Sequence, residues 1–267
     1  MPILILRFLC ILCTYSNWTN KIMNELLEND VITFFAGLSR QAPGDDRLSL
    51  SIMQGLQGMR PSSRIADFGC GTGSATLLLA EHFHSLIYAI DLAELFLDVL
   101  MVSAKKKNLD GFIQPKCADM GLTDELPSAL DLIWCEGSAY IIGFASALKD
   151  WHGLLNPGGI LVVSECVWLN PDPPSKTRDF WQAAYPAIGS EEDARELAES
   201  LGYEVLDSRT LPESAWQSYY REVETALESP EGLKLTPDFR DGMREEAKIY
   251  HGSESSYGYL FLILRKT

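Results

Sequence analysis

The hydrophobic positions of this chain fall into short runs that are apolar on both faces, separated by longer stretches with helical spacing. A first run ends in Asp67, and further strands are predicted over residues 85–90, 112–118, 131–135 and 160–169. Helices are predicted over residues 24–38, 46–59, 93–109 and 144–155, with a turn at Asn-Pro-Gly-Gly before the last strand. Strands that are apolar on both faces are typical of a parallel sheet covered by helices. The order predicts an open, doubly wound α/β domain that binds its ligand at the carboxyl ends of the strands.

Acidic residues follow these strands one after another. Asp67, Asp91, Asp119 and Glu136 come at or just after the first four strand ends, and Glu165 lies late in the fifth strand. A single acid at a strand end is unremarkable, because aspartate commonly caps the next helix. Five in series indicate a shared ligand.

The glycine-rich turn after the first strand, in RIADFGCGTGSATLLLA (64–80), separates the possible ligands. A dinucleotide-binding turn has the pattern G-x-G-x-x-G. Here Gly69 and Gly71 fit the first two glycines, but Ser74 stands at the position of the third, and Gly73 comes one residue before it. Asp67 would repel a pyrophosphate by about 3 kcal/mol, at roughly 5 Å and an effective dielectric near 20, and would attract a cation by a similar amount.

S-adenosylmethionine joins a carboxylate, an ammonium and a sulfonium to an adenosine, and therefore suits all these groups. The glycines let the backbone approach closely, and the N-terminus of the helix that begins near Ser74 favours the ligand carboxylate. Asp91, 20 residues after Gly71, is placed to accept hydrogen bonds from the ribose hydroxyls. Asp119 is placed to accept one from the adenine amino group.

Five motifs in order carry a family resemblance: DFGCGTG, Asp91 after an apolar strand, CADM…LP (117–127), DLIWCEG (131–137) and LNPGGILVVSE (155–165). Over roughly residues 40–210 the chain resembles class I S-adenosylmethionine-dependent methyltransferases. It is most similar to the small-molecule branch that includes ubiquinone- and sterol-type enzymes. The resemblance implies a mostly parallel, seven-stranded Rossmann-like sheet, with an antiparallel last strand at 257–266 beside 203–211. It also implies cofactor contacts from Asp67, Gly69, Gly71, Gly73, Asp91, Asp119 and Met120, and from Gln41 and Gly44 in the turn that closes over the methionine part.

The sequence indicates less clearly which residues contact the molecule that accepts the methyl group. Methyl transfer to an activated sulfonium depends mainly on alignment, so a base is optional. Glu136 and Glu165 are the candidates for a base, and hydrogen bonding to helix amines or loop backbone is the alternative for both. Tyr140 and Trp168 follow strand ends and, with Glu136, are the expected substrate contacts.

We expect an apolar N-terminal extension (1–22) and a single methyltransferase domain (23–267). Helical and aromatic segments that cap the domain are expected from about 23–59, 169–200 and 212–256. The cap segments near the C-terminus form a helical insertion.

Composition and charge limit the kinds of partner that we expect this protein to bind. The net charge of −15 opposes nucleic acid, and six irregularly spaced cysteines favour reduced thiols and no metal site. The extension is too short for a confident membrane span, so we expect a cytoplasmic enzyme with a small-molecule acceptor and no membrane partner. The oligomeric state stays open, with a homodimer as one option. Two alternatives to methyl transfer also stay open: a non-catalytic S-adenosylmethionine-binding protein and a nucleotide-dependent oxidoreductase, which Asp67 and the missing third glycine oppose.

Overall fold

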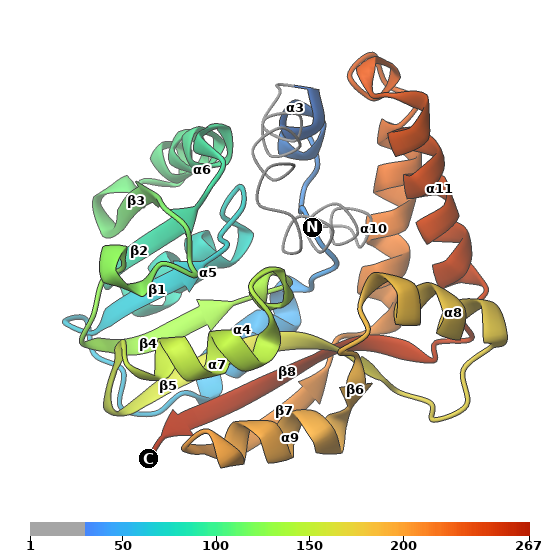
Figure 1. Ribbon diagram of the computed structural model, residues 1–267. Coiled ribbons are helices and arrows are strands. Elements are labelled where there is room, and N and C mark those ends of the chain that lie inside the picture. Colours follow the sequence, from blue (N-terminus) through green and yellow to red (C-terminus); the bar gives the residue numbers. More distant parts are fainter. Residues whose placement is uncertain (1–29) are drawn as a thin grey trace.

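A mixed β-sheet forms the centre of the computed structural model, which describes residues 30–267 (Figure 1). The sheet order is β3-β2-β1-β4-β5-β8-β7, and the short β6 pairs with β5. The strands from β3 to β5 pair in parallel, whereas β8 is antiparallel to both of its neighbours. This confirms the predicted Rossmann-like sheet with its antiparallel last strand. The strands are β1 (Arg64–Phe68), β2 (Leu86–Asp91), β3 (Ile113–Cys117), β4 (Leu130–Cys135), β5 (Leu155–Trp168), β6 (Gly189–Ser190), β7 (Tyr203–Thr210) and β8 (Tyr257–Lys266).

Helices cover both faces of the sheet and create two hydrophobic cores. In β4, Leu132 and Trp134 belong to one core, and Ile133 and Cys135 belong to the other. Helices α4, α5 and α6 contribute to the first core, and α7 and α9 to the second. This alternation explains why a central strand such as β4 is apolar on both faces, whereas the edge strand β3 is exposed over most of its length. The helices are α3 (Asp30–Ala36), α4 (Asp46–Gly55), α5 (Ser74–Phe83), α6 (Glu94–Lys107), α7 (Phe144–His152), α8 (Ser175–Ala184), α9 (Glu191–Ser200), α10 (Glu213–Ala226) and α11 (Pro237–His251).

Helices α10 and α11 pack against each other beside the sheet, with α8 in contact with α11 (Figure 1). Aromatic side chains form their contact surface. Trp216 and Tyr250 stack with ring centroids 5.5 Å apart and planes 10° apart, and Tyr257 of β8 meets Trp216 edge-on. The aromatic residues of the predicted cap segment 212–256 therefore pack largely on one another.

The structure differs from the predicted elements at Asn-Pro-Gly-Gly, which was expected to be a turn before a strand at 160–169. It lies inside β5, which begins at Leu155 and pairs there with Leu130. The register shifts between Leu130 and Leu132, so the strand accommodates the irregular segment. Gly159 has no room for a side chain, because a Cβ would lie 3.0 Å from the Leu130 carbonyl oxygen.

Two predicted segments fall partly or wholly outside residues 30–267. The helix predicted at 24–38 is described from Asp30 and ends at Ala36. The helix predicted at 46–59 lies within the described residues, but it ends at Gly55 because the backbone of Leu56 is already extended. The apolar extension 1–22 lies outside the described residues.

Candidate functional site

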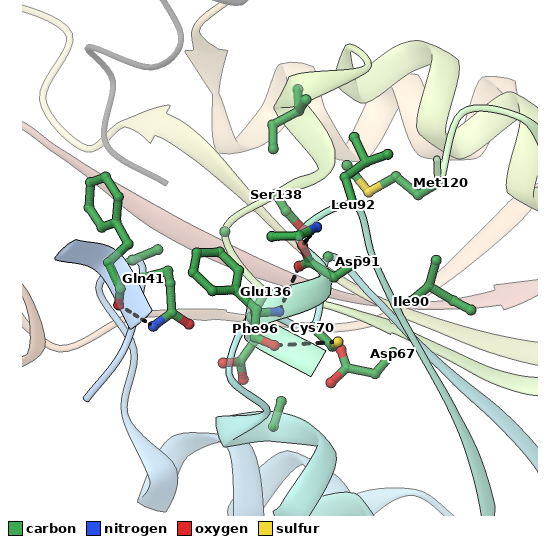
Figure 2. Close-up of a pocket in the computed structure, with 18 of the residues that line it drawn as sticks. Gln41, Asp67, Cys70, Ile90, Asp91, Leu92, Phe96, Met120, Glu136 and Ser138 are labelled. Carbon is green, nitrogen blue, oxygen red and sulfur yellow. Dashed lines mark hydrogen bonds between the residues drawn. The ribbon is translucent and has the colours of Figure 1, made fainter. Parts of the chain in front are cut away.

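A cavity lies at the carboxyl ends of β1, β2, β3 and β4, and the labelled side chains of Figure 2 surround it. Eight of the thirteen predicted site residues line it, namely Gln41, Asp67, Gly69, Gly71, Asp91, Asp119, Met120 and Glu136. The other five do not: Gly44, Gly73, Tyr140, Glu165 and Trp168. The fold thus brings together most of the residues predicted to bind the cofactor, whereas two of the three predicted substrate contacts lie elsewhere.

The glycine turn connects β1 to α5 in a conformation that other residues rarely adopt. Gly69, Gly71 and Gly73 have φ angles of 65°, 55° and 91°. A side chain at Gly69 would collide with Ser138, and one at Gly71 would collide with Gln41. Gly73 has a different reason to be glycine, because a side chain there would meet Leu100 of α6. Gly69 and Gly71 therefore form the cavity wall, and Gly73 permits close helix packing.

Asp91 ends β2 and holds the turn in place. Its Oδ2 accepts a hydrogen bond from the Gly71 amide (2.8 Å, Figure 2), and its Oδ1 accepts one from the Ala93 amide (2.9 Å). Burial raises the pKa of this carboxyl, and the two amides oppose that rise. Each carboxylate oxygen has a second lone pair. Asp91 can therefore accept hydrogen bonds from a ligand while it anchors Gly71.

Asp67 lies at the base of the cavity and is 1% exposed. The Thr76 hydroxyl of α5 donates a hydrogen bond of 2.6 Å to its Oδ2. Burial raises the pKa of Asp67 to about 8, against the weaker opposing effect of Thr76, and the nearby Glu136 and Asp91 add to the rise. The protein thus holds a neutral acid at pH 7 that a cation in the cavity would convert to a carboxylate.

We expect Asp67→Asn to raise the free energy of unfolding by about 1–2 kcal/mol at pH 7. Between pH 4 and 8 the folded protein retains a proton on Asp67 that the unfolded chain has released, so the stability of the wild type falls as pH rises through this window. Asparagine has no such proton, and the gain should vanish below pH 4. Chemical denaturation at pH 3.5 and pH 7 checks this. The exposed Asp150→Asn is the control, and an equal gain at both pH values would contradict the titration.

Gln41 holds the segment 39–44 over the glycine turn. Its Oε1 accepts hydrogen bonds from the Thr72 amide (2.9 Å) and hydroxyl (3.1 Å), and its Nε2 donates to the Phe35 carbonyl (3.0 Å, Figure 2). Helix α10 holds the same segment from outside, because Glu222 accepts from the Ser39 amide (2.7 Å). The predicted role of this segment in closing over a ligand is consistent with these contacts.

Arg40 is a residue of the site that the sequence did not single out. Its guanidinium bonds Glu136 Oε2 (3.0 Å) and Asp46, and the Ser49 hydroxyl donates to the other oxygen of Glu136. Both oxygens of Glu136 are therefore engaged, and in this arrangement the residue anchors segment 39–44 to the end of β4. Gly44 leaves space for this ion pair, because a Cβ there would lie 2.8 Å from Arg40 Cζ.

Arg40→Met should weaken cofactor affinity by about tenfold, because it releases the segment that carries Gln41 and leaves Glu136 without its cation. The exposed Arg47→Met, on the adjoining helix α4, should leave the affinity unchanged. Calorimetric titration of both variants makes the comparison. Equal affinities in the two variants would show that segment 39–44 does not depend on this ion pair.

Asp119 and Met120 line the cavity beyond β3. Asp119 Oδ1 accepts a hydrogen bond from the Gly121 amide (2.8 Å), and the Met120 carbonyl accepts one from Trp151 Nε1 of α7 (3.0 Å). Met120 is 7% exposed and belongs to the second hydrophobic core. The loop after β3 is thereby tied to α7 and presents one carboxylate and one thioether to the cavity.

The predicted acceptor contacts Tyr140 and Trp168 pack into the protein outside the cavity wall. Tyr140 is buried, and its ring meets Tyr185 edge-on at 6.2 Å. Trp168 is half-buried against the first core and faces Tyr257 in the register of β5 and β8. Glu165, also in β5, is 4% exposed. None of these three residues lines the cavity, although each was predicted to do so from its position at or near the end of a strand.

Within residues 30–267, no three histidine, cysteine or acidic side chains come together as a metal site. Cys70, Cys117, Cys135 and Cys166 are free thiols. No described helix has the length and apolarity needed to cross a bilayer.

Comparison with known proteins gives consistent matches. Residues 65–159 match the family described as methyltransferase domain. The uncharacterized methyltransferase YodH of Bacillus subtilis is 23% identical over 86% of this chain and 95% of its own. Malonyl-[acyl-carrier protein] O-methyltransferase 2 of Coxiella burnetii is 35% identical over 42% of this chain and 45% of its own. A methyltransferase structure from Geobacter sulfurreducens, in complex with S-adenosylhomocysteine, has a TM-score of 0.75 at 18% identity and covers 89% of this chain and 98% of its own.

Proposed function

Because this chain belongs to the class I S-adenosylmethionine-dependent methyltransferases, we propose that it methylates a small-molecule acceptor by in-line displacement. The observation that carries the proposal is the cavity itself. Four parallel strands end around it, and each contributes residues there: Asp67 with the glycine turn, Asp91, Asp119 with Met120, and Glu136. This is the edge of the sheet where an α/β fold binds its ligand.

The chemistry of the cavity fits the methyl donor better than it fits a phosphate-rich nucleotide. Asp67, Asp91 and Asp119 all line it, and the guanidinium of Arg40 is already paired with Glu136 and Asp46. A buried acid with a pKa of about 8 is suited to meet an ammonium or sulfonium. Gly69 and Gly71 line the cavity with backbone alone, so a ligand there can contact the turn directly.

The lining residues that were predicted to bind the cofactor each have a place in this proposal. Asp91 would accept from the ribose hydroxyls, and Asp119 and Met120 would contact the adenine. Gly69, Gly71, Asp67 and Gln41 would surround the methionine part. When bound, S-adenosylmethionine supplies an electrophilic methyl carbon on a sulfonium.

The residues of the chain contribute alignment and exclusion of water. Segment 39–44, held by Gln41, Arg40 and Ser39, would cover the cavity and fix the donor for attack along one line. Glu136 is part of this anchor, so it is not proposed as a base. The acceptor would approach over the ends of β4 and β5, because the adenosine contacts lie on the other side, at β2 and β3.

Calorimetry and a turnover assay test the proposal. We expect S-adenosylmethionine and S-adenosylhomocysteine to bind, NAD not to bind, and S-adenosylhomocysteine to accumulate when the protein is incubated with its methyl donor and a mixture of small metabolites. Binding of NAD in place of S-adenosylmethionine would contradict the proposal.

A further inference from the structure

Segment 39–44, which lies over the glycine turn, is also hydrogen-bonded to helix α10 of the cap. One carboxylate oxygen of Glu222 accepts from the Ser39 amide (2.7 Å), and the other accepts from the Ser39 hydroxyl. One turn earlier in α10, the Tyr219 hydroxyl donates to the Gln41 carbonyl (3.3 Å). Neither Glu222 nor Tyr219 lines the cavity. Three hydrogen bonds therefore connect the segment over the cavity to a helix that contributes no residue to the cavity wall.

Ser39 and Gln41 continue these connections to the start of helix α5. The Ser39 carbonyl accepts a hydrogen bond from the hydroxyl of Ser74 (3.2 Å), which is the first residue of α5 and lines the cavity. Gln41 Oε1 accepts from the amide and the hydroxyl of Thr72 in the glycine turn. Each of the two residues thus bonds α10 on one side and the cavity wall on the other, so a change at α10 is transmitted to the wall.

Helix α10 is itself fixed to the sheet by aromatic contacts. Tyr220 stacks on Tyr250 of α11 with ring centroids 4.9 Å apart, and the Trp216 ring is tilted against that of Tyr259 in β8 at 4.8 Å. All four side chains are buried. Since β8 pairs with β5 inside the sheet, packing sets the position of α10 relative to the strand ends. The helix is therefore a firm support for segment 39–44.

Helix α11 supports the same segment through α3. The Phe239 ring of α11 meets the Phe35 ring of α3 edge-on, with centroids 6.3 Å apart. The Phe35 carbonyl accepts the hydrogen bond from Gln41 Nε2 (Figure 2). The position of Gln41 over the glycine turn thus depends on both helices of the C-terminal insertion, on α10 directly and on α11 through α3.

We propose that Glu222 and Tyr219 are positioning residues for the methyl donor. Through Ser39 and Gln41, they hold segment 39–44 closed over the methionine part of S-adenosylmethionine. The helical insertion near the C-terminus is in this way part of the donor-binding machinery. The inference rests on the proposed function, in which the methionine part lies under this segment and the adenosine part lies at β2 and β3.

The test compares S-adenosylhomocysteine with adenosine as probes, using calorimetry on the full-length protein. Glu222→Ala removes both acceptors for Ser39. We expect the affinity for S-adenosylhomocysteine to fall about five- to tenfold, because the segment that covers the methionine part is released. The affinity for adenosine should stay unchanged, because adenosine does not reach that segment. A role in stability alone does not produce this difference between the two probes.

Three further variants assign the effect. Glu222→Gln keeps one oxygen that accepts from the Ser39 amide, so it should recover most of the affinity for S-adenosylhomocysteine. Tyr219→Phe removes only the hydroxyl that bonds Gln41, and should weaken S-adenosylhomocysteine by about two- to threefold and adenosine not at all. Glu224→Ala, exposed on the same helix, is the matched control and should leave both affinities unchanged.

Unchanged affinity for S-adenosylhomocysteine in Glu222→Ala and Tyr219→Phe would overturn the proposal, because α10 would then only attach the cap to the domain. Equal losses for S-adenosylhomocysteine and adenosine would overturn it too, since they would indicate a general disturbance of the fold. If Glu222→Ala does not fold, the loss of one hydroxyl in Tyr219→Phe keeps the test decisive. Failure of the wild type to bind S-adenosylhomocysteine would instead overturn the proposed function, so the two failures are distinguishable.

Discussion

Gly71→Ala should lower the affinity for S-adenosylmethionine by about 100-fold or more. Gly71 has a φ of 55°, which an alanine adopts only with strain. The new Cβ would also collide with Gln41, which bonds the Thr72 backbone and holds segment 39–44 over the cavity. Displacement of Gln41 would open the site, and movement of the Gly71 amide would break its hydrogen bond to Asp91. Calorimetric titration measures the loss directly.

Gly58→Ala separates backbone strain from the effect on the site. Gly58 has a φ of 86°, and nothing lies within 4 Å of a Cβ built there. Both variants should lose about 1 kcal/mol of unfolding free energy from strain, but only Gly71→Ala should lose affinity. A similar fall in affinity for both would mean that strain alone, rather than the collision with Gln41, weakens binding.

Asp91→Ala should weaken binding of S-adenosylmethionine by about 1–3 kcal/mol, or roughly 5–150-fold. The substitution removes two proposed contacts with the ribose and also the acceptors for the Gly71 and Ala93 amides. The glycine turn would then lose its link to β2, so the methionine part of the ligand should be affected as well. Calorimetry with S-adenosylmethionine and with adenosine alone tests both consequences.

The exposed Asp98→Ala on α6 is the matched control, since it removes the same charge seven residues away. It should leave both affinities unchanged. If Asp91→Ala bound S-adenosylmethionine like the wild type, the ribose would lie elsewhere and the assignment of the adenosine half to β2 would fail. A loss for S-adenosylmethionine but not for adenosine would restrict Asp91 to its role in the turn.

Seven of the nine residues predicted to bind the cofactor line the cavity, and for Asp67, Asp91 and Asp119 this position follows from chain order. Parallel strands bring their carboxyl ends to one edge of the sheet. Once the strands were identified, Asp67, Asp91 and Asp119 were therefore expected to lie together at that edge, and they do. Positive φ at Gly69 and Gly71 follows from the same turn. Strand-end position was a weaker guide to the acceptor side. Tyr140 follows the end of β4 and Trp168 is the last residue of β5, yet both pack against the first core, because position at a strand end does not fix which way a side chain points.

The ion pair between Arg40 and Glu136 shows what sequence reasoning lacked. The two residues are 96 positions apart, and no spacing rule relates them. From the sequence, Glu136 was a candidate base with hydrogen bonding as the alternative, and the folded chain engages both of its oxygens. The basic residue directly before Gln41 was the available signal. Likewise, the need for glycine at position 44 became visible only when Arg40 was seen above it.

By itself, the sequence determined the sheet, the glycine turn and the series of acids from which the ligand was predicted, because these depend on local periodicity and on the order of strands along the chain. Only the tertiary structure decided the ionisation and the partners of those acids. Burial made Asp67 and Glu165 weak acids, with pKa values near 8, and Arg40 made Glu136 an anchor. Solvation and pairing depend on which side chains meet from distant parts of the chain, and these long-range contacts are set by packing rather than by local sequence.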